Sequence, residues 1–150
     1  MMSIDGEIVI ARPIEEVFDF VADERNEPTF NPRMLRAKKL TLGPLGTGTR
    51  FTATVKSVGR KFDMTIEFTT YERPTRLEST SRMSSAESRG ALIFEPHPEG
   101  TRMRWSWDVE PKGAAKLLTP LIDRMGTHQE DVIWANLKRH LEAMPTTASG

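Results

Sequence analysis

Apolar and polar residues alternate with period two along most of the chain, which predicts a β-sheet. Residues 4–10 show this alternation first, and it returns almost without interruption from about Arg33 to Glu110. Short turn signals divide the second stretch at 43–48, Gly59, Pro74 and 96–100. Successive strands with one apolar face, joined by short turns, are typical of an antiparallel meander with one side exposed to water.

Two segments show helical spacing instead. A short helix is predicted to begin at Pro13, because apolar residues follow it at helical intervals as far as Val21, and residues 23–31 can add another helical turn. A long helix is predicted over about 113–143, either kinked at Pro120 or starting afresh there. Strands followed by a covering helix predict the α+β class, with a curved antiparallel sheet around the long C-terminal helix.

The long helix carries one broad stripe that we expect to face the sheet: Leu118, Leu121, Ile122, Met125, Val132, Ile133, Asn136 and His140. Glu130 and Asp131 fall off this stripe and are expected to be solvated. Trp134 is expected on the opposite side, where it could mark a contact between two copies of the chain in a homodimer.

Small residues on two neighbouring strands predict unfilled space under that helix. The parity that turns Leu77 inward also turns Ser79 and Ser81 inward, and the next strand offers Ser88 and Gly90 on the matching face. Arg82 and Arg89 then point outward. A strongly twisted sheet cannot be filled by one helix, so this strip favours room for a guest molecule. The alternative is that small residues let the helix approach the sheet closely.

Length and composition narrow the class of protein. A chain of 150 residues with 37% apolar side chains fits one domain, which we place at 1–144, followed by a disordered tail at 145–150. The absence of cysteine excludes disulfides and thiolate metal sites. Twenty-one basic and twenty-one acidic residues, spread along the chain, argue against nucleic-acid binding. No transmembrane segment or signal peptide is evident, which favours a cytoplasmic protein.

The three histidines predict neither a metal site nor a bound cofactor. His97 lies between two prolines in a predicted hairpin turn and is expected to be solvated. His128 and His140 would be about 18 Å apart along a helix, too far to share a metal ion. No phosphate-binding glycine loop and no Gly-x-Ser-x-Gly nucleophile turn occurs.

Five segments together carry a resemblance to a known family: residues 10–18, Phe30-Asn31-Pro32, 46–51, 71–77 and the hairpin 94–102. In their order and spacing the chain resembles the polyketide cyclase/dehydrase-like family of the START/Bet v 1-type (SRPBCC, helix-grip) superfamily. The resemblance implies about seven antiparallel strands, one or two short helices after the first strand, and a cavity. Members of the family bind sterols, lipids, polyketides, hormones or aromatic compounds, and a minority catalyse cyclisation or dehydration.

The function expected on these grounds is binding of a small hydrophobic ligand, lipid-, polyketide- or aromatic-like, between the sheet and the long helix. The residues expected to line the site are Phe51, Met64, Ile66, Phe68, Ser79, Ser81, Gly90, Leu92, Trp105, Trp107, Leu121, Met125 and Gln129. Gln129 could pair with a ligand or equally with a backbone group or water.

Two alternatives stay open. One is a cyclase or dehydratase that uses His140 or His128 for general acid–base catalysis in the same cavity. The other is a protein that binds a lipid or a partner and docks through the loops near Phe30 and the long helix. The sequence alone leaves open whether the chain is an enzyme.

Overall fold

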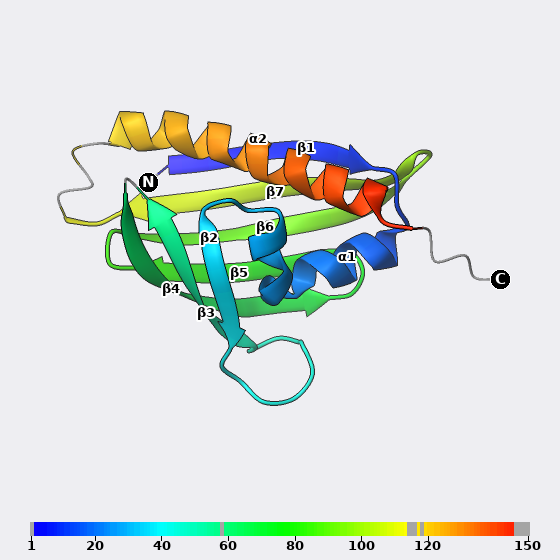
Figure 1. Ribbon diagram of the computed structural model, residues 1–150, viewed down its shortest axis with the longest axis horizontal. Helices are drawn as coiled ribbons and strands as arrows, with labels where there is room; N and C mark the ends of the chain where they lie inside the picture. The colour runs from blue at the N-terminus through cyan, green and yellow to red at the C-terminus, as the bar shows by residue number, and fades with distance from the viewer. Residues whose placement is uncertain (1, 58, 114–116, 118, 146–150) are drawn as a thin grey trace.

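The computed structural model (Figure 1) describes residues 2–57, 59–113, 117 and 119–145, with only the backbone described at 2, 57 and 119–126. Its strands are β1 (Met2–Ile10), β2 (Met34–Lys39), β3 (Arg50–Ser57), β4 (Arg60–Glu72), β5 (Arg76–Met83), β6 (Ala86–His97) and β7 (Gly100–Pro111). Its helices are α1 (Ile14–Ala22), the 3-10 helix η1 (Glu24–Thr29) and α2 (Thr119–Ala143). The tail predicted to be disordered falls, from residue 146 on, outside the described residues, as do parts of the predicted helix before Thr119.

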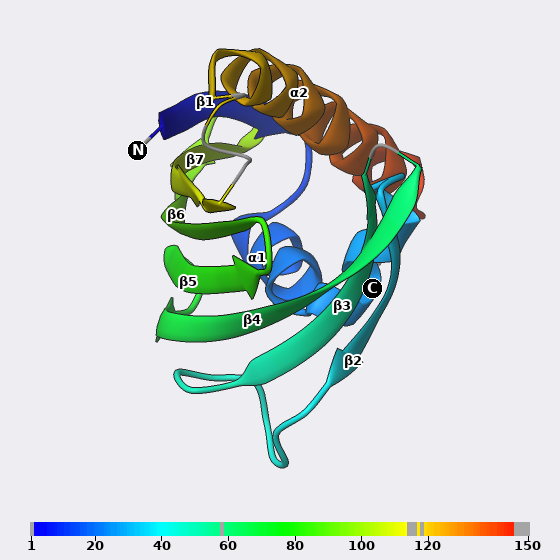
Figure 2. The same ribbon diagram turned by 90° about the vertical axis from the view of Figure 1, so that its left-hand side faces the viewer.

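The strands form one antiparallel sheet in the order β1-β7-β6-β5-β4-β3-β2, which confirms the predicted meander and fold class. The sheet curls around its concave face, and α2 crosses the open side (Figure 2). Ser79 pairs with Gly90 and Ser81 pairs with Ser88, as the parity of the two strands predicted. The side chains of Arg82 and Arg89 are exposed, as expected for the outer face.

The core fills the end of the concave face that lies next to α1. Val17, Phe18, Val21 and Ala22 of α1 are buried, so the predicted apolar face of this helix is confirmed. Phe18 contacts the ring of Phe94 edge-on, with the ring centroids 5.2 Å apart. Such edge-to-face pairs add to the stabilisation that burial of the rings provides.

The long helix begins at Thr119, so the fresh start at the Thr119–Pro120 step is the alternative that the structure adopts. Its buried side is rotated by one residue from the predicted stripe. Ile133, Trp134, Leu137 and Leu141 are buried, whereas Val132 is 37% exposed. One residue is about 100° around a helix, which is enough to exchange the inward and lateral faces.

The prediction that Trp134 faces outward is therefore wrong, and its side chain gives no indication of a homodimer contact. Trp134 is 4% exposed and lies against the rings of Phe30 and Trp105, with centroid distances of 5.9 and 5.8 Å. The physical reason is that a large indole is stabilised most by burial among other rings. Among the described residues, no helix is both long and apolar enough to cross a membrane.

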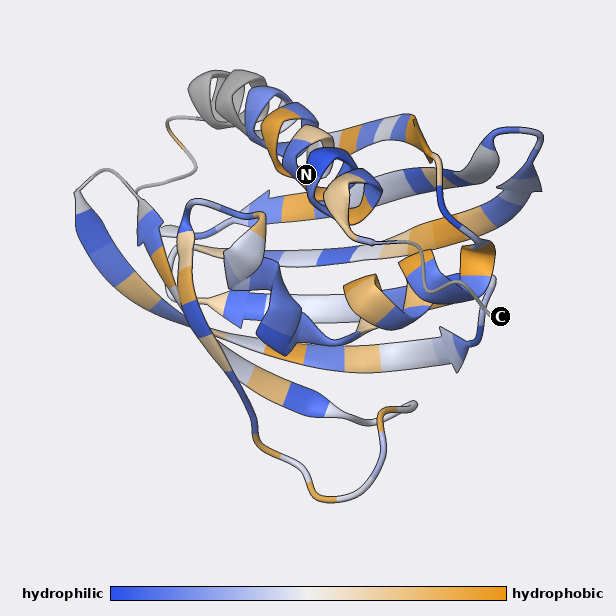
Figure 3. Cartoon of the chain, turned by 45° about the vertical axis from the view of Figure 1, so that its right-hand side comes forward, coloured by the Kyte–Doolittle hydropathy of each residue, from blue (hydrophilic) through white to orange (hydrophobic). Residues whose placement is uncertain are grey.

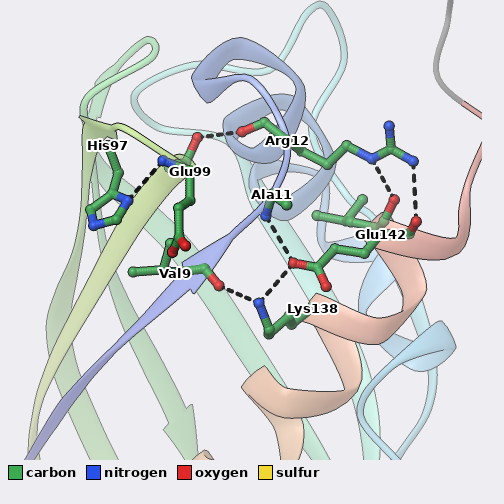
Figure 4. Close-up of polar contacts among 9 residues, drawn as sticks. Val9, Ala11, Arg12, His97, Glu99, Lys138 and Glu142 are labelled. Atoms are coloured by element: carbon green, nitrogen blue, oxygen red, sulfur yellow. Dashed lines mark hydrogen bonds and ion pairs between the residues drawn. The ribbon is translucent and has the colours of Figure 1, made fainter.

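Arg12 fastens the carboxyl end of α2 to the corner between β1 and α1 (Figure 4). Its Nε donates to the carbonyl of Leu141 at 2.7 Å, and its Nη2 donates to the carbonyls of Glu142 and Met144. On the same corner, Lys138 Nζ donates to the carbonyl of Val9 at 2.7 Å. The last carbonyls of a helix have no partner within the helix, so Arg12 supplies donors that α2 itself lacks.

Replacing Arg12 with Ala should lower the free energy of unfolding by about 2–4 kcal/mol, because buried carbonyls lose a charged donor. Chemical denaturation measures the effect, and Arg12→Lys, which retains one donor group, should lose less. Arg25→Ala is the matched control: Arg25 is 52% exposed in its pair with Asp23, so its loss should cost about 1 kcal/mol or less. Equal losses for Arg12→Ala and Arg25→Ala would show that Arg12 does not anchor α2.

Candidate functional site

The concave face of the sheet is divided into a packed end and an accessible end. At the packed end the inward-facing side chains are buried: Phe51, Ile66, Phe68, Leu77, Leu92, Phe94, Met103 and Trp105. At the other end they stay partly exposed: Val55, Phe62, Met64, Ser81, Met83, Ala86, Ser88, Trp107 and Val109. This accessible end lies under the start of α2, on the left in Figure 1, and α1 lies toward the other end. Side chains of the inner face therefore remain reachable by solvent at one end.

The residues that the sequence predicted to line a site divide between the two ends. Met64, Ser81, Gly90, Trp107 and Gln129 are partly exposed and lie at or next to the accessible end. Phe51, Ile66, Phe68, Ser79, Leu92 and Trp105 are buried. The side chains of Leu121 and Met125 lie outside the described residues. Their common role in lining a ligand site stays a prediction.

Two glycines of the sheet leave space that tryptophans occupy. A Cβ atom on Gly90 would lie 2.3 Å from Cε3 of Trp107 and 2.1 Å from the carbonyl oxygen of Ser106. A Cβ atom on Gly6 would lie 2.4 Å from Cζ2 of Trp105. The presence of glycine at position 90 is therefore explained by packing, because it allows the indole of Trp107 to lie close against β6.

Glu130 lies between two indoles where the packed and accessible ends meet. The Nε1 atoms of Trp107 and Trp134 both donate to its Oε2, at 3.1 and 2.6 Å. Trp107 reaches it from β7, and Trp134 lies one turn further along α2. Because both donors use the same oxygen, Oε1 stays outside this pair of hydrogen bonds. The expectation that Glu130 is solvated is wrong, since the same rotation of α2 that buries Trp134 also turns Glu130 inward.

Burial raises the pKa of Glu130 from 4.5 to about 7. The indole hydrogen bonds favour the charged carboxylate, whereas nearby Glu27 and Asp131 disfavour it. Loss of hydration outweighs the two hydrogen bonds, as expected for a carboxyl enclosed by rings. Near neutral pH this group is therefore present both as an acid and as a base, which suits proton transfer or hydrogen bonding in either direction.

A row of polar contacts joins α2 to η1 and to the turn that follows it. Asn136 donates to the carbonyl of Phe30 at 3.1 Å, which gives this amide a structural role. The amide oxygen of Gln129, when it is turned toward Arg33, accepts hydrogen bonds from both terminal nitrogens of that guanidinium, at 3.0 and 3.2 Å. The partner of Gln129 is thus a charged side chain, where the sequence left ligand, backbone and water open.

Besides Glu130, two further glutamates are buried close to each other: Glu24 and Glu27 of η1. Burial raises the pKa of both carboxyls, and the neighbouring charges of Glu27 and Asp23 raise that of Glu24 further. Asn31 stabilises Glu27 by donating its amide at 2.8 Å. Glu130 is the better candidate for contact with a ligand, because it lies beside Trp107 of the accessible end.

The structure gives neither of the two helical histidines a position suited to catalysis at the accessible end. His128 is exposed, and His140 lies against the ring of Phe20 with a centroid distance of 5.3 Å. His97 accepts a hydrogen bond from the backbone N–H of Glu99 within its hairpin. Across the described part of the chain, no three His, Asp or Glu side chains gather in a way that could hold a metal ion.

Glu130 was not predicted as a site residue, because the side of α2 that was predicted to face the sheet is not the side that does so. The signal was present: Ile133, Leu137 and Leu141 repeat at four-residue intervals, with Trp134 beside them. Extending that stripe back by one turn leads to Glu130.

Comparison with known proteins supports the fold. The family described as polyketide cyclase / dehydrase and lipid transport matches residues 1–142. A protein of Thermus thermophilus, TTHA0849, superposes with a TM-score of 0.81 at 18% identity, covering 99% of each chain. A START superfamily protein of Mycobacterium smegmatis superposes with a TM-score of 0.79 at 14% identity, covering 95% of this chain and 98% of that one.

A third solved structure, Ara h 8.0201, superposes with a TM-score of 0.63 at 14% identity, covering 90% of this chain and 97% of that one. At such identities these likenesses concern the fold alone. Among proteins with curated descriptions, none matches the sequence significantly.

The raised pKa of Glu130 predicts how stability depends on pH. An unfolded glutamate ionises near pH 4.5, whereas Glu130 keeps its proton to about pH 7. The free energy of unfolding should therefore fall as pH rises from about 4.5 to about 7. The part of this fall that is due to Glu130 should be about 3 kcal/mol at most. Urea denaturation at a series of pH values measures this loss.

Glu130→Gln imitates the protonated carboxyl and should remove this part of the pH dependence. Glu99→Gln, at an exposed glutamate of the turn between β6 and β7, should leave it unchanged. If wild type and Glu130→Gln lose the same free energy over this range, Glu130 is not a buried acid.

Proposed function

Because this chain belongs to the family described as polyketide cyclase / dehydrase and lipid transport, we propose that it binds a small hydrophobic molecule between the sheet and α2. The single observation that carries the proposal is the partial exposure of apolar inner-face side chains such as Phe62, Met64 and Trp107. Covering these side chains with an apolar ligand would remove their surface from water, which is the main source of affinity in such sites.

Glu130 supplies the polar contact in this proposal. It lies beside Trp107, next to the apolar surface that the ligand would cover, and Oε1 stays outside the indole hydrogen bonds. A single polar group within an apolar site orients a ligand by pairing with its hydroxyl or carbonyl group. A lipid-, polyketide- or aromatic-like molecule that carries one such oxygen fits this arrangement.

Binding of the neutral fluorophore N-phenyl-1-naphthylamine tests the proposal. Its fluorescence should rise on binding to a saturable site of one molecule per chain. Ser88→Trp, which fills the accessible end, should weaken binding by about tenfold or more, and Trp107→Ala should weaken it through loss of contact area.

The matched control is Val132→Trp, which adds the same ring to a side of α2 that is 37% exposed. This variant should bind as wild type does. Absence of saturable binding, or equal binding by Ser88→Trp and wild type, would contradict a site at the accessible end.

The raised pKa of Glu130 favours one second function, the cyclase or dehydratase of the family's description. In a dehydration, the carboxylate would remove a proton from the carbon next to a ketone. The carbon–carbon double bond would form as the β-hydroxyl leaves, and the protonated carboxyl would return its proton to that hydroxyl to give water. A group with a pKa near 7 suits both transfers, so Glu130 replaces the histidines as the candidate acid–base residue.

A β-hydroxyketone of the aryl-alkyl type tests this second function. Glu130→Gln should abolish formation of the conjugated ketone, followed by its ultraviolet absorbance, while binding of the naphthylamine persists. His128→Gln with His140→Gln should leave turnover intact. Undiminished turnover by Glu130→Gln would remove Glu130 from the mechanism and leave the binding function standing.

A further inference from the structure

Charge is strongly segregated along the chain, although its total is zero. Residues 33–70 contain eight basic and two acidic side chains, a net charge of +6, so the remaining residues carry −6. Both signs are spread along the chain, but they are not evenly distributed. The equal totals hide a segment of this kind.

The fold gathers this basic segment on three neighbouring strands. β2, β3 and β4 lie side by side at one edge of the sheet. Their exposed basic side chains are Arg36, Lys38, Arg50, Lys56, Arg60 and Lys61. Among the described residues none of these six forms an ion pair, whereas Arg82, Arg89, Arg102 and Arg104 on the outer face of β5–β7 are all paired with glutamates. One edge of the sheet thus carries a net positive charge, although Asp63 and Glu67 of β4 lie among its basic residues.

The loop between β2 and β3 adds exposed leucines to this edge. Leu42 is 99% exposed and Leu40 is 53% exposed, and Leu35 on β2 is 44% exposed. Gly43 and Gly48 adopt positive φ values of 87° and 90°, which form the bends that carry the loop away from the sheet. The loop projects from the body of the molecule in Figure 1 and carries apolar bands in Figure 3 next to hydrophilic ones on β2.

We propose that the β2–β4 edge and its leucine loop dock onto the surface of an anionic lipid bilayer. Leu40 and Leu42 would enter the boundary between headgroups and acyl chains, and the basic side chains would contact the anionic headgroups. Exposed apolar residues beside unpaired lysine and arginine form the combination that binds such interfaces. Nucleic acid would also attract the positive charge, but a phosphate backbone gives no reason for exposed leucines.

This inference goes beyond the proposed function and does not depend on it, since Leu40 and Leu42 lie in the loop after β2, whereas the accessible end is lined by inner-face side chains of β3–β7. Ligand binding could fail while docking persists, or the reverse.

Flotation of the full chain with lipid vesicles tests the proposal. Vesicles that contain one third phosphatidylglycerol should carry the protein, and vesicles of phosphatidylcholine alone should carry about tenfold less. High salt should weaken binding to the vesicles that contain phosphatidylglycerol, because it screens the charges. Leu40→Ser with Leu42→Ser should reduce it about fivefold or more, whereas Val132→Ser, at an exposed apolar residue on α2, should not.

Charge variants complete the design. Lys38→Gln with Arg50→Gln should weaken vesicle binding, and Arg89→Gln with Arg104→Gln, which removes the same charge from the other part of the sheet, should leave it unchanged. Equal losses in the two pairs would show that only net charge matters and would overturn the docking surface. Absence of vesicle binding, or binding to a DNA duplex that the leucine variants do not affect, would also overturn it.

Discussion

The anchoring of α2 across the concave face of the sheet is the constraint on which the rest of the structure depends. A curved sheet has to cover its apolar inner face, and α2 is the helix that spans its open side (Figure 2). Arg12 holds the carboxyl end of this helix through carbonyls that the helix cannot satisfy itself. The rings of Phe30, Trp134 and Trp105 then fix its rotation. Once position and rotation are set, every other side chain of α2 has a defined direction.

That rotation produces the chemistry of the interior. It buries Trp134 and brings Glu130 within hydrogen-bonding distance of Trp107 on β7. The same contacts that stabilise the helix therefore hold a carboxyl at the border between packed core and accessible surface. Burial costs the charged form part of its hydration and raises its pKa to about 7. A structural requirement and a functional property thus arise from one arrangement of rings.

The two ends and two faces of the sheet serve different purposes in this picture. The inner face is packed beside α1 and accessible under the start of α2, where the proposed ligand would lie. The outer face carries paired charges on β5–β7 but unpaired positive charges on β2–β4. The basic edge shares β3 and β4 with the ligand site, but its exposed leucines lie on β2 and in the loop after it. Most of its basic side chains alternate with the inner-face residues, so each surface can be altered by substitution without direct disturbance of the other.

The sequence by itself determined the antiparallel meander from β2 to β7, the inward parity of its strands and the family, because period-two alternation and turn residues act locally and survive any error in distant packing. It also placed Arg82 and Arg89 outside. Only the tertiary structure decided which side of α2 faces inward. Two apolar stripes one residue apart both fit that helix, and the choice between them depends on rings from β7 and the turn after η1, which no local pattern contains.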